Sequence, residues 1–302
     1  MTDRTAVLPM GNDKPRRRWR RWLFGFVVFN FVGWWLSAYL FALFATQAHP
    51  SMVPDWTELD GFALESVEVV AVDGVHTRGW LLGPSRDRVV VLAAGIRGNR
   101  TAMVQRARWH ASRGWSALVV DLRGTGESEP ERLSMGWHEA LDLVAWRAML
   151  RQRGFRTVGV HAVSLGAAAA SYADQRDPDG GLWDFLVLES CYSNLLATLM
   201  DRIPGVPAFA FWPLLTCSGW VLGLDTDDLD PVRALAKMSE PTMIVCGADD
   251  QKVGEGATEA LYAACEGRKR AKFLVPGVGH HDLWPHDTAA LQGAIAAFVD
   301  GL

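Results

Sequence analysis

One strand-to-helix turn constrains the fold of this chain more than any other feature. The apolar run Thr157–Val163 ends at Ser164, and an alanine-rich stretch begins at Leu165. Ala162 and Gly166 are both small, as they must be where a strand and the helix that follows it nearly touch. The pattern therefore predicts a strand, a sharp turn and a helix, with the serine hydroxyl exposed at the tip of a sheet.

Two more candidate residues follow later strands. Asp250 comes after the apolar run Thr242–Cys246, and His280 comes after Lys272–Val275 on a glycine-containing loop. Open α/β sheets collect functional groups beyond the carboxyl ends of their strands, so both side chains are expected near Ser164. A serine hydroxyl becomes a good nucleophile only when a base lies within hydrogen-bonding reach. The sequence predicts a catalytic triad with Ser164 as nucleophile, His280 as general base and Asp250 as the carboxylate that holds the imidazole.

Strands and helices alternate through the rest of this region. Val67–Val72 and Val75–Leu82 have the pattern of strands, and Asp73-Gly74 between them favours a two-residue hairpin. Strands separated by helices predict an α/β fold with a mainly parallel, doubly wound sheet. Further strands are expected at 89–93, 117–121, 157–163, 185–188, 242–246 and 272–275, and helices at 101–112, 135–153, 231–237, 258–264 and 288–299.

An eight-residue motif completes a resemblance. Asp121-Leu122-Arg123-Gly124-Thr125-Gly126-Glu127-Ser128 follows a predicted strand, and we expect Arg123, Gly124 and Gly126 to shape that turn. With the chain order serine, aspartate, histidine, the motif resembles the α/β-hydrolase superfamily. The resemblance covers about residues 66–302 and is closest to serine hydrolases of the BEM46 and ABHD12/ABHD13-like type. It implies an α/β-hydrolase fold with a small lid, cleavage of an ester or thioester through an acyl-enzyme, and no cofactor or metal.

The resemblance also implies an oxyanion hole built from backbone amides. The amides of Ile96 and Leu165 are the expected donors to the charge that develops during acyl transfer. Ala94-Gly95 stands where the family has His-Gly, a change that keeps the backbone donor. Arg97, beside the hole, is either a contact for an anionic or polar acyl group or a solvated loop arginine.

A second acid remains open. Some members of the superfamily carry the acid at the end of the sixth strand, where Glu189 stands here. The resemblance favours Asp250, because the Gly-x-x-Asp pattern of the superfamily begins here at Gly247, and Asp249 is then a solvated turn carboxylate. His281 is expected at the surface, and three other histidines fit helix or strand positions without a catalytic role: His110, His138 and His161.

The amino-terminal region predicts a membrane anchor. Leu23–Ala45 holds no charged side chain and is long enough to cross a hydrocarbon core of about 30 Å as a helix. Basic residues precede it, and Asp55, Glu58 and Asp60 follow it, so the positive-inside rule places the amino terminus in the cytoplasm. We expect a basic cytoplasmic tail (1–21), a transmembrane anchor (22–45), a connector (46–65) and an extracytoplasmic hydrolase domain (66–302). The basic residues are Lys14, Arg16, Arg17, Arg18, Arg20 and Arg21.

Two alternatives to a retained anchor exist. Thr46-Gln47-Ala48 resembles a weak processing site, but the apolar core of a signal peptide usually has only about 7 to 15 residues. A buried core helix is also conceivable, although the run lacks a polar face. The length of the run favours the anchor.

The insertion 194–228 stands where a lid is expected. Its segment Ile203–Leu215 is apolar and broken by prolines, and Phe209, Phe211 and Trp212 are the predicted substrate contacts. An apolar lid beside a bilayer suits a small-molecule or lipid-like acyl substrate, and a lid that merely packs on the domain is the alternative. Alternative functions are a serine peptidase of the same fold and a catalytically silent receptor or scaffold at the membrane.

Charge and cysteine content exclude some other classes. A net charge of −4 gives no basic surface for nucleic acid. Four cysteines without metal-ligand spacing are too few for a disulfide scaffold. Cys246 and Cys265 fit buried positions, whereas a pair between Cys191 and Cys217 is left open, as is the oligomeric state.

Overall fold

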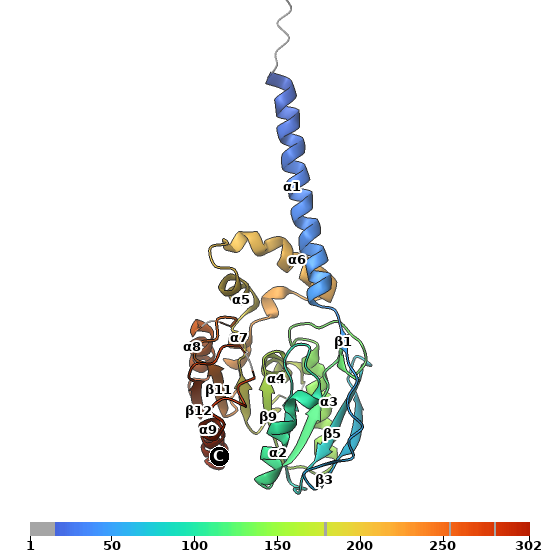
Figure 1. Cartoon of the computed structure of the whole chain (residues 1–302), viewed down its shortest axis with the longest axis vertical. Helices are drawn as coiled ribbons and strands as arrows, with labels where there is room; N and C mark the ends of the chain where they lie inside the picture. Colours follow the sequence, from blue (N-terminus) through green and yellow to red (C-terminus); the bar gives the residue numbers. More distant parts are fainter. Residues whose placement is uncertain (1–15, 178–179, 254, 281) are drawn as a thin grey trace, which may run out of the picture.

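A twisted sheet of eight strands forms the centre of the protein (Figure 1). The computed structural model describes residues 16–177, 180–253, 255–280 and 282–302. The strands lie in the order β4-β5-β7-β6-β9-β10-β11-β12, with β4 and β5 antiparallel to their neighbours and the others parallel. Their bounds are β4 Glu65–Val70, β5 His76–Leu82, β6 Arg88–Ala93, β7 Ser116–Val120, β9 Thr157–Val163, β10 Leu186–Glu189, β11 Thr242–Gly247 and β12 Arg270–Val275. This is the predicted mainly parallel, doubly wound sheet.

Helices cover both faces of the sheet because the central strands are apolar on both sides. In β6, Val89 and Val91 face one hydrophobic cluster while Val90 and Leu92 face the other. The first cluster includes residues of α3 (Glu139–Gln152), α4 (Leu165–Arg176), α7 (Pro231–Leu235) and α8 (Glu255–Ala264). The second includes residues of α2 (Val104–Ser112) and α9 (Thr288–Asp300). Every central strand thus ends between two helical layers.

Most predicted boundaries hold within a few residues, and helix α3 is the main correction. It begins at Glu139 rather than at Met135. Met135 and Gly136 both have positive φ angles, 59° and 103°, which a helix does not accommodate. A Cβ on Gly136 would lie 2.7 Å from the amide nitrogen of Ala169 in α4. Because Gly136 packs closely against α4, α3 begins only at Glu139.

The amino-terminal helix α1 extends from Arg16 to Ala45 and projects away from the domain (Figure 1). Its segment Trp19–Ala45 is long and apolar enough to cross a membrane. The predicted tail lies outside the described residues up to position 15. Within the predicted connector, β1 (His49–Pro50) pairs in parallel with β8 (Thr125–Gly126), and β2 (Glu58–Leu59) pairs with β3 (Phe62–Ala63). The connector is thus bonded to the domain.

The predicted lid is helical. Helix α5 (Leu195–Arg202) begins at Asn194, whose side chain accepts a hydrogen bond from the amide of Ala197 at 2.8 Å. The 3₁₀ turn η2 (Ala208–Phe211) leads into α6 (Trp212–Leu222), which packs on α1, and η3 (Thr226–Asp228) precedes α7. Figure 1 shows α6 lying across α1 above the body of the domain.

All four cysteines are buried free thiols. Cys191 belongs to the large hydrophobic cluster of the domain, and Cys217 belongs to the separate cluster between α1 and α6. The pairing that the sequence leaves open is therefore not present in this structure.

Candidate active site

Ser164 occupies a strained turn between β9 and α4. Its backbone angles are φ 51° and ψ −109°, a conformation that L-residues rarely adopt. The turn is held because the amide of Ser164 donates to the carbonyl of Glu189 at 2.8 Å and the amide of Gly166 donates to that of Ala94 at 3.2 Å. A Cβ on Gly166 would lie 2.7 Å from the carbonyl oxygen of Ala93, so only glycine fits. The predicted strand, sharp turn and helix are all present around Ser164.

His280 lies between Ser164 and Asp250. Its Nε2 atom is 3.4 Å from the serine Oγ, and its Nδ1 atom is 2.8 Å from Oδ2 of Asp250. The carboxylate is buried, and its other oxygen accepts the amides of Lys252 at 3.0 Å and Val253 at 3.3 Å. Burial alone would raise the pKa of Asp250, but the hydrogen bond and charge of His280 outweigh it and lower that pKa. The acid is thus held as a carboxylate beside the imidazole.

The loops that carry the acid and the base approach each other closely at Gly247. A Cβ on this residue would lie 2.8 Å from the carbonyl oxygen of Gly279, one residue before His280. Asp249, by contrast, is exposed, and its amide donates to the carbonyl of Val278 at 3.0 Å. The structure therefore brings Asp250, rather than Asp249, to the histidine.

Glu189, the alternative acid, is engaged elsewhere. Its carboxylate is fully buried and bonded to Arg106 at 2.9 and 2.6 Å and to Nε2 of His161 at 2.5 Å. Burial alone would raise the pKa of Glu189, but the charge and hydrogen bonds of Arg106 and the hydrogen bond of His161 together outweigh it and hold the pKa at about 2. Nδ1 of His161 lies 3.1 Å from Nε2 of His110, which extends the buried network. This geometry corrects the alternative assignment, because His280 is bonded to Asp250.

Two backbone amides near the serine are available as donors. Leu165 is the first residue of α4, where helical amides have no partner within the helix. Ile96 lies on the loop after β6, and a Cβ on the neighbouring Gly95 would be only 3.2 Å from Cβ of Ser164. Among the described residues, neither amide has a recorded acceptor, and both residues line the same cavity as Ser164. Their placement fits the predicted oxyanion hole.

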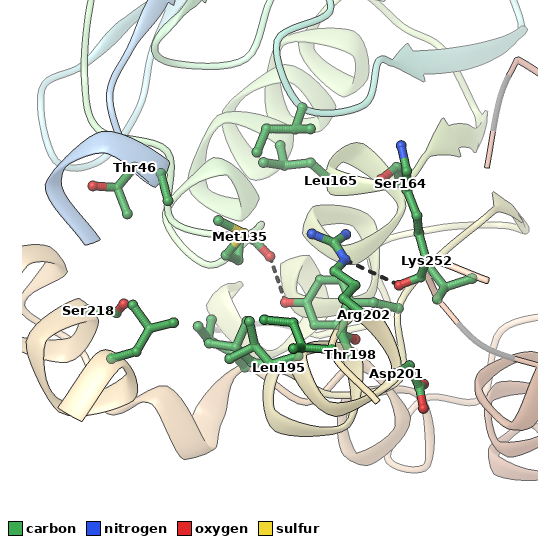
Figure 2. Close-up of a pocket in the computed structure, with 18 of the residues that line it drawn as sticks. Thr46, Met135, Ser164, Leu165, Leu195, Thr198, Asp201, Arg202, Ser218 and Lys252 are labelled. Atoms are coloured by element: carbon green, nitrogen blue, oxygen red, sulfur yellow. Dashed lines mark hydrogen bonds between the residues drawn. The ribbon is translucent and has the colours of Figure 1, made fainter. Parts of the chain in front are cut away.

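A cavity of about 790 Å³ adjoins the serine (Figure 2). Its floor includes Ser164 and His280, and its walls are mostly apolar side chains from α5, α6 and the end of α1. The phenol of Tyr192 donates to the carbonyl of Met135 at 2.8 Å. Nε of Arg202 donates to the carbonyl of Lys252 at 3.3 Å, a bond drawn as a dashed line in Figure 2. The apolar wall residues are Phe41, Phe44, Leu195, Leu199, Ile203, Leu214 and Leu215.

The predicted substrate contacts are only partly in place. Arg97 lines the cavity, with its guanidinium 5.8 Å from the ring centroid of Phe44. Phe209, Phe211 and Trp212 do not line it, which corrects the sequence prediction. Phe209 is 71% exposed, Phe211 is buried, and Trp212 packs edge-on against Trp35 of α1 at 5.3 Å. Other parts of the lid face the site instead, since Leu199 of α5 and Leu214 and Leu215 of α6 line the cavity.

The contribution of α1 to the site was missed from the sequence. Phe41, Phe44 and Ala45 of α1 line the cavity that holds Ser164. Nothing in their sequence separates them from the lipid-facing residues of an apolar span. Among the residues that the structure describes, no group of three or more metal-binding side chains is found.

Sequence comparisons find relatives that share the domain. No family model matches the chain. The uncharacterized protein YqkD of Bacillus subtilis is 24% identical over 242 residues, which cover 76% of this chain and 77% of that protein. The uncharacterized protein YfhR of Salmonella typhi is 28% identical over 239 residues, covering 72% and 75% of the two chains.

Structure comparisons agree on the fold. The esterase Pf2001 of Pyrococcus furiosus superposes with a TM-score of 0.68 at 18% identity, covering 84% of this chain and 98% of that one. An acetyl xylan esterase from Paenibacillus sp. R4 gives a TM-score of 0.61 at 18% identity, covering 87% and 92%. A bacterial membrane phospholipase A gives 0.59 at 15% identity, covering 93% and 98%. The chain therefore has the α/β-hydrolase fold, as predicted.

Proposed function

We propose that this protein is a membrane-anchored serine hydrolase that cleaves carboxylic esters or thioesters through an acyl-enzyme. The observation that carries the proposal is the hydrogen-bonded series Ser164, His280 and Asp250 at the floor of a largely apolar cavity. Within the α/β-hydrolases, we propose a place among the BEM46 and ABHD12/ABHD13-like enzymes, on the strength of the Asp121–Ser128 motif and the serine turn.

The triad supplies the proton transfers. Nε2 of His280 takes the proton of the Ser164 hydroxyl as the oxygen attacks the acyl carbon, and later gives it to the leaving alcohol or thiol. Asp250 fixes the imidazole by accepting the hydrogen bond from Nδ1 and stabilises its charged form. A water molecule, activated by the same histidine, then releases the acid. The 3.4 Å separation of serine and histidine suits a free enzyme, in which such bonds tighten when substrate binds.

The amides of Ile96 and Leu165 stabilise the oxyanion of the tetrahedral intermediate. Leu165 adds the positive end of the α4 dipole, because its amide points out of the first turn of that helix. One such donor typically contributes about 10²–10³ in rate. The two amides therefore account for a large part of the expected acceleration.

The anchoring of the enzyme is the second half of the proposal. Helix α1 spans the membrane, with the basic residues before position 22 on the cytoplasmic side and the hydrolase domain on the other side. The apolar cavity wall favours a substrate with a hydrocarbon acyl chain, since each buried CH₂ contributes about 0.8 kcal/mol.

A fluorophosphonate probe tests the catalytic half. The full chain in detergent should be labelled, Ser164→Ala should not, and Ser66→Ala, at an exposed position on β4, should be labelled like the wild type. Hydrolysis of p-nitrophenyl esters, with an aminoacyl p-nitroanilide beside them, separates an esterase from a peptidase. Absence of labelling in the wild type would favour the catalytically silent receptor and reject the proposal.

A further inference from the structure

We propose that helix α6 is a second membrane-contacting element, immersed in the leaflet on the side of the hydrolase domain, and that the cavity opens into this leaflet. The esters that reach Ser164 are then molecules that reside in the bilayer. This inference rests on the anchorage by α1 in the proposed function. It names the surface that α6 binds and the route by which the substrate arrives.

The composition of the α6 region fits a membrane surface. No charged residue occurs between Arg202 and Asp225. The apolar helical segment Ala208–Leu222 is too short to cross a bilayer, which takes about 20 residues. A segment of this length is typical of a buried core helix or of a helix that lies within the membrane interface. Its burial decides between these two possibilities.

Helix α6 and the 3₁₀ turn before it do not form a buried core helix, because three of their aromatic side chains are largely exposed. Phe209 is 71% exposed, Trp212 57% and Trp220 68%. Three aromatic side chains within twelve positions form a large apolar surface that is costly in water. Tryptophan is the residue that membrane interfaces favour most, since one end of its ring is apolar and the other donates a hydrogen bond.

The position of α6 along α1 places it inside the bilayer. The ring centroid of Trp35 in α1 lies 5.3 Å from that of Trp212 and 5.8 Å from that of Trp220. Ala38 and Ala42 pack against Cys217. A core of about 30 Å that begins after Arg21 takes about 20 residues and ends near Phe41. Trp35 then lies about 9 Å below that boundary, a depth at which interfacial helices bury their apolar faces.

Hydrogen bonds join the end of α1 to the domain, so the domain and α6 cannot move away from the membrane independently of α1. Nη1 of Arg132 donates to the carbonyl of Leu43 and to Oγ1 of Thr46, both at 3.2 Å. The amide of Leu133 donates to the carbonyl of Thr46 at 2.8 Å. The span, α6 and the domain thus keep one arrangement, and the depth of α6 follows from the depth of α1.

The same arrangement puts the side of the cavity formed by α1 and α6 at the surface of the hydrocarbon core. Phe41 and Phe44 come from α1 and Leu214 and Leu215 from α6, and all four line the cavity whose floor is Ser164. An acyl chain can therefore pass from the leaflet to the serine along apolar side chains, without crossing water.

Photochemical labelling tests the contact directly. The full chain is reconstituted in phosphatidylcholine vesicles that contain a phosphatidylcholine with a diazirine on its acyl chain, irradiated and digested. We expect lipid adducts on α1 and on Ile203–Leu224. The hairpin tip at Val72, which is 87% exposed, should carry none and serves as the control surface.

A charge substitution tests the consequence for activity. Trp220→Glu should lower hydrolysis of a long-chain ester embedded in the vesicles at least about tenfold, because a carboxylate is costly at this depth. Hydrolysis of soluble p-nitrophenyl acetate should stay within about twofold, which reports an intact fold and triad. Val72→Glu and the conservative Trp220→Phe should behave like the wild type in both assays.

Each outcome has a separate meaning. Adducts on α1 without adducts on α6, or cross-links between the α6 helices of two copies, overturn the inference and leave the hydrolase proposal standing. An absence of adducts on α1 rejects the anchorage and this inference with it. Adducts on both helices in a protein that does not react with a fluorophosphonate uphold α6 as a membrane helix and reject the proposed function.

Discussion

Arg106 and Glu189 form an ion pair inside the domain, with Nη2 2.6 Å from Oε2 and both side chains at most 1% exposed. The pair lies next to the catalytic elements on two sides. The carbonyl of Glu189 accepts the amide of Ser164 at 2.8 Å, and Nη2 of Arg106 also lies 2.8 Å from the carboxylate of Asp282, two residues after His280. One buried cation thus ties the serine turn to the histidine loop.

Removing this cation should destabilise the protein strongly. Arg106→Met leaves Glu189 as an uncompensated buried charge, and we expect a loss of about 3–5 kcal/mol in the free energy of unfolding, measured by chemical denaturation in detergent. The matched control is Arg113→Met, which removes a partly exposed pair with Asp300 and should cost less than about 1 kcal/mol. Equal effects of the two changes would show that the buried pair has no special role.

The buried histidines beside the pair should make stability depend on pH. Burial is the largest cause that lowers the pKa of His110 and of His161 below the ordinary 6.5, and the charge of His161 lowers that of His110 further. Below about pH 6.5 the histidines of the unfolded chain therefore bind protons that the two buried histidines of the folded chain do not bind. The free energy of unfolding is highest above that pH and decreases as the pH falls below it. Unfolding measured between about pH 7.5 and 5.5 should show this slope, and His110→Gln should reduce it. A flat profile in the wild type would contradict the prediction.

The identity of the acid can be tested with neighbouring carboxylates. Asp250→Asn should lower kcat by about 10³–10⁴ with a short p-nitrophenyl ester, because the amide no longer stabilises the charged imidazole. Asp249→Asn, at the adjacent exposed position, should leave kcat within about twofold. If Asp249→Asn were the inactive variant, the assignment of the triad would be wrong.

Local signals were enough to predict the sheet and the meeting of the three catalytic candidates. The run Thr157–Val163 and the small residues around Ser164 describe a turn whose geometry is fixed within a few residues. The expected hairpin joins β4 and β5, but its turn runs from Ala71 to Gly74, whose amide donates to the carbonyl of Ala71 at 2.9 Å, rather than being a two-residue turn at Asp73-Gly74. The placement of Asp250 and His280 near Ser164 follows from the rule that parallel strands end at one edge of the sheet.

Features set by contacts between distant segments could not be predicted in this way. Met135 reads as a helical residue, but close packing of Gly136 on α4 forces both into left-handed conformations. The sequence predicts Phe209 and Trp212 in the site because both lie in the apolar lid. No sequence signal indicates which face of that lid points toward the serine. Packing of α6 on Trp35 of α1 decides that question.

Gly166, two residues after the serine, provides a steric test. In Gly166→Ala the new Cβ would lie 2.7 and 2.8 Å from the carbonyl oxygens of Ala93 and Ala94, which belong to backbone and cannot rotate away. We expect a loss of about 1–3 kcal/mol in stability and, since the loop with Ile96 is displaced, a fall of about 10²-fold in kcat. Gly293→Ala in α9 meets no atom within 4 Å and should instead stabilise the helix by up to about 1 kcal/mol. A fully active Gly166→Ala enzyme would argue against the close approach.

The side chains that line the cavity should set the preference of the enzyme for acyl-chain length. Leu215 lines the cavity, whereas Phe209 does not. In detergent, kcat/KM of the wild type should rise from p-nitrophenyl acetate toward longer chains, by up to about fourfold for each CH₂ that becomes buried. Leu215→Trp should fill part of the cavity and move the optimum to a shorter chain, and Phe209→Ala should leave the optimum unchanged. A shift caused by Phe209→Ala but not by Leu215→Trp would restore the original sequence prediction and reject this cavity as the acyl site.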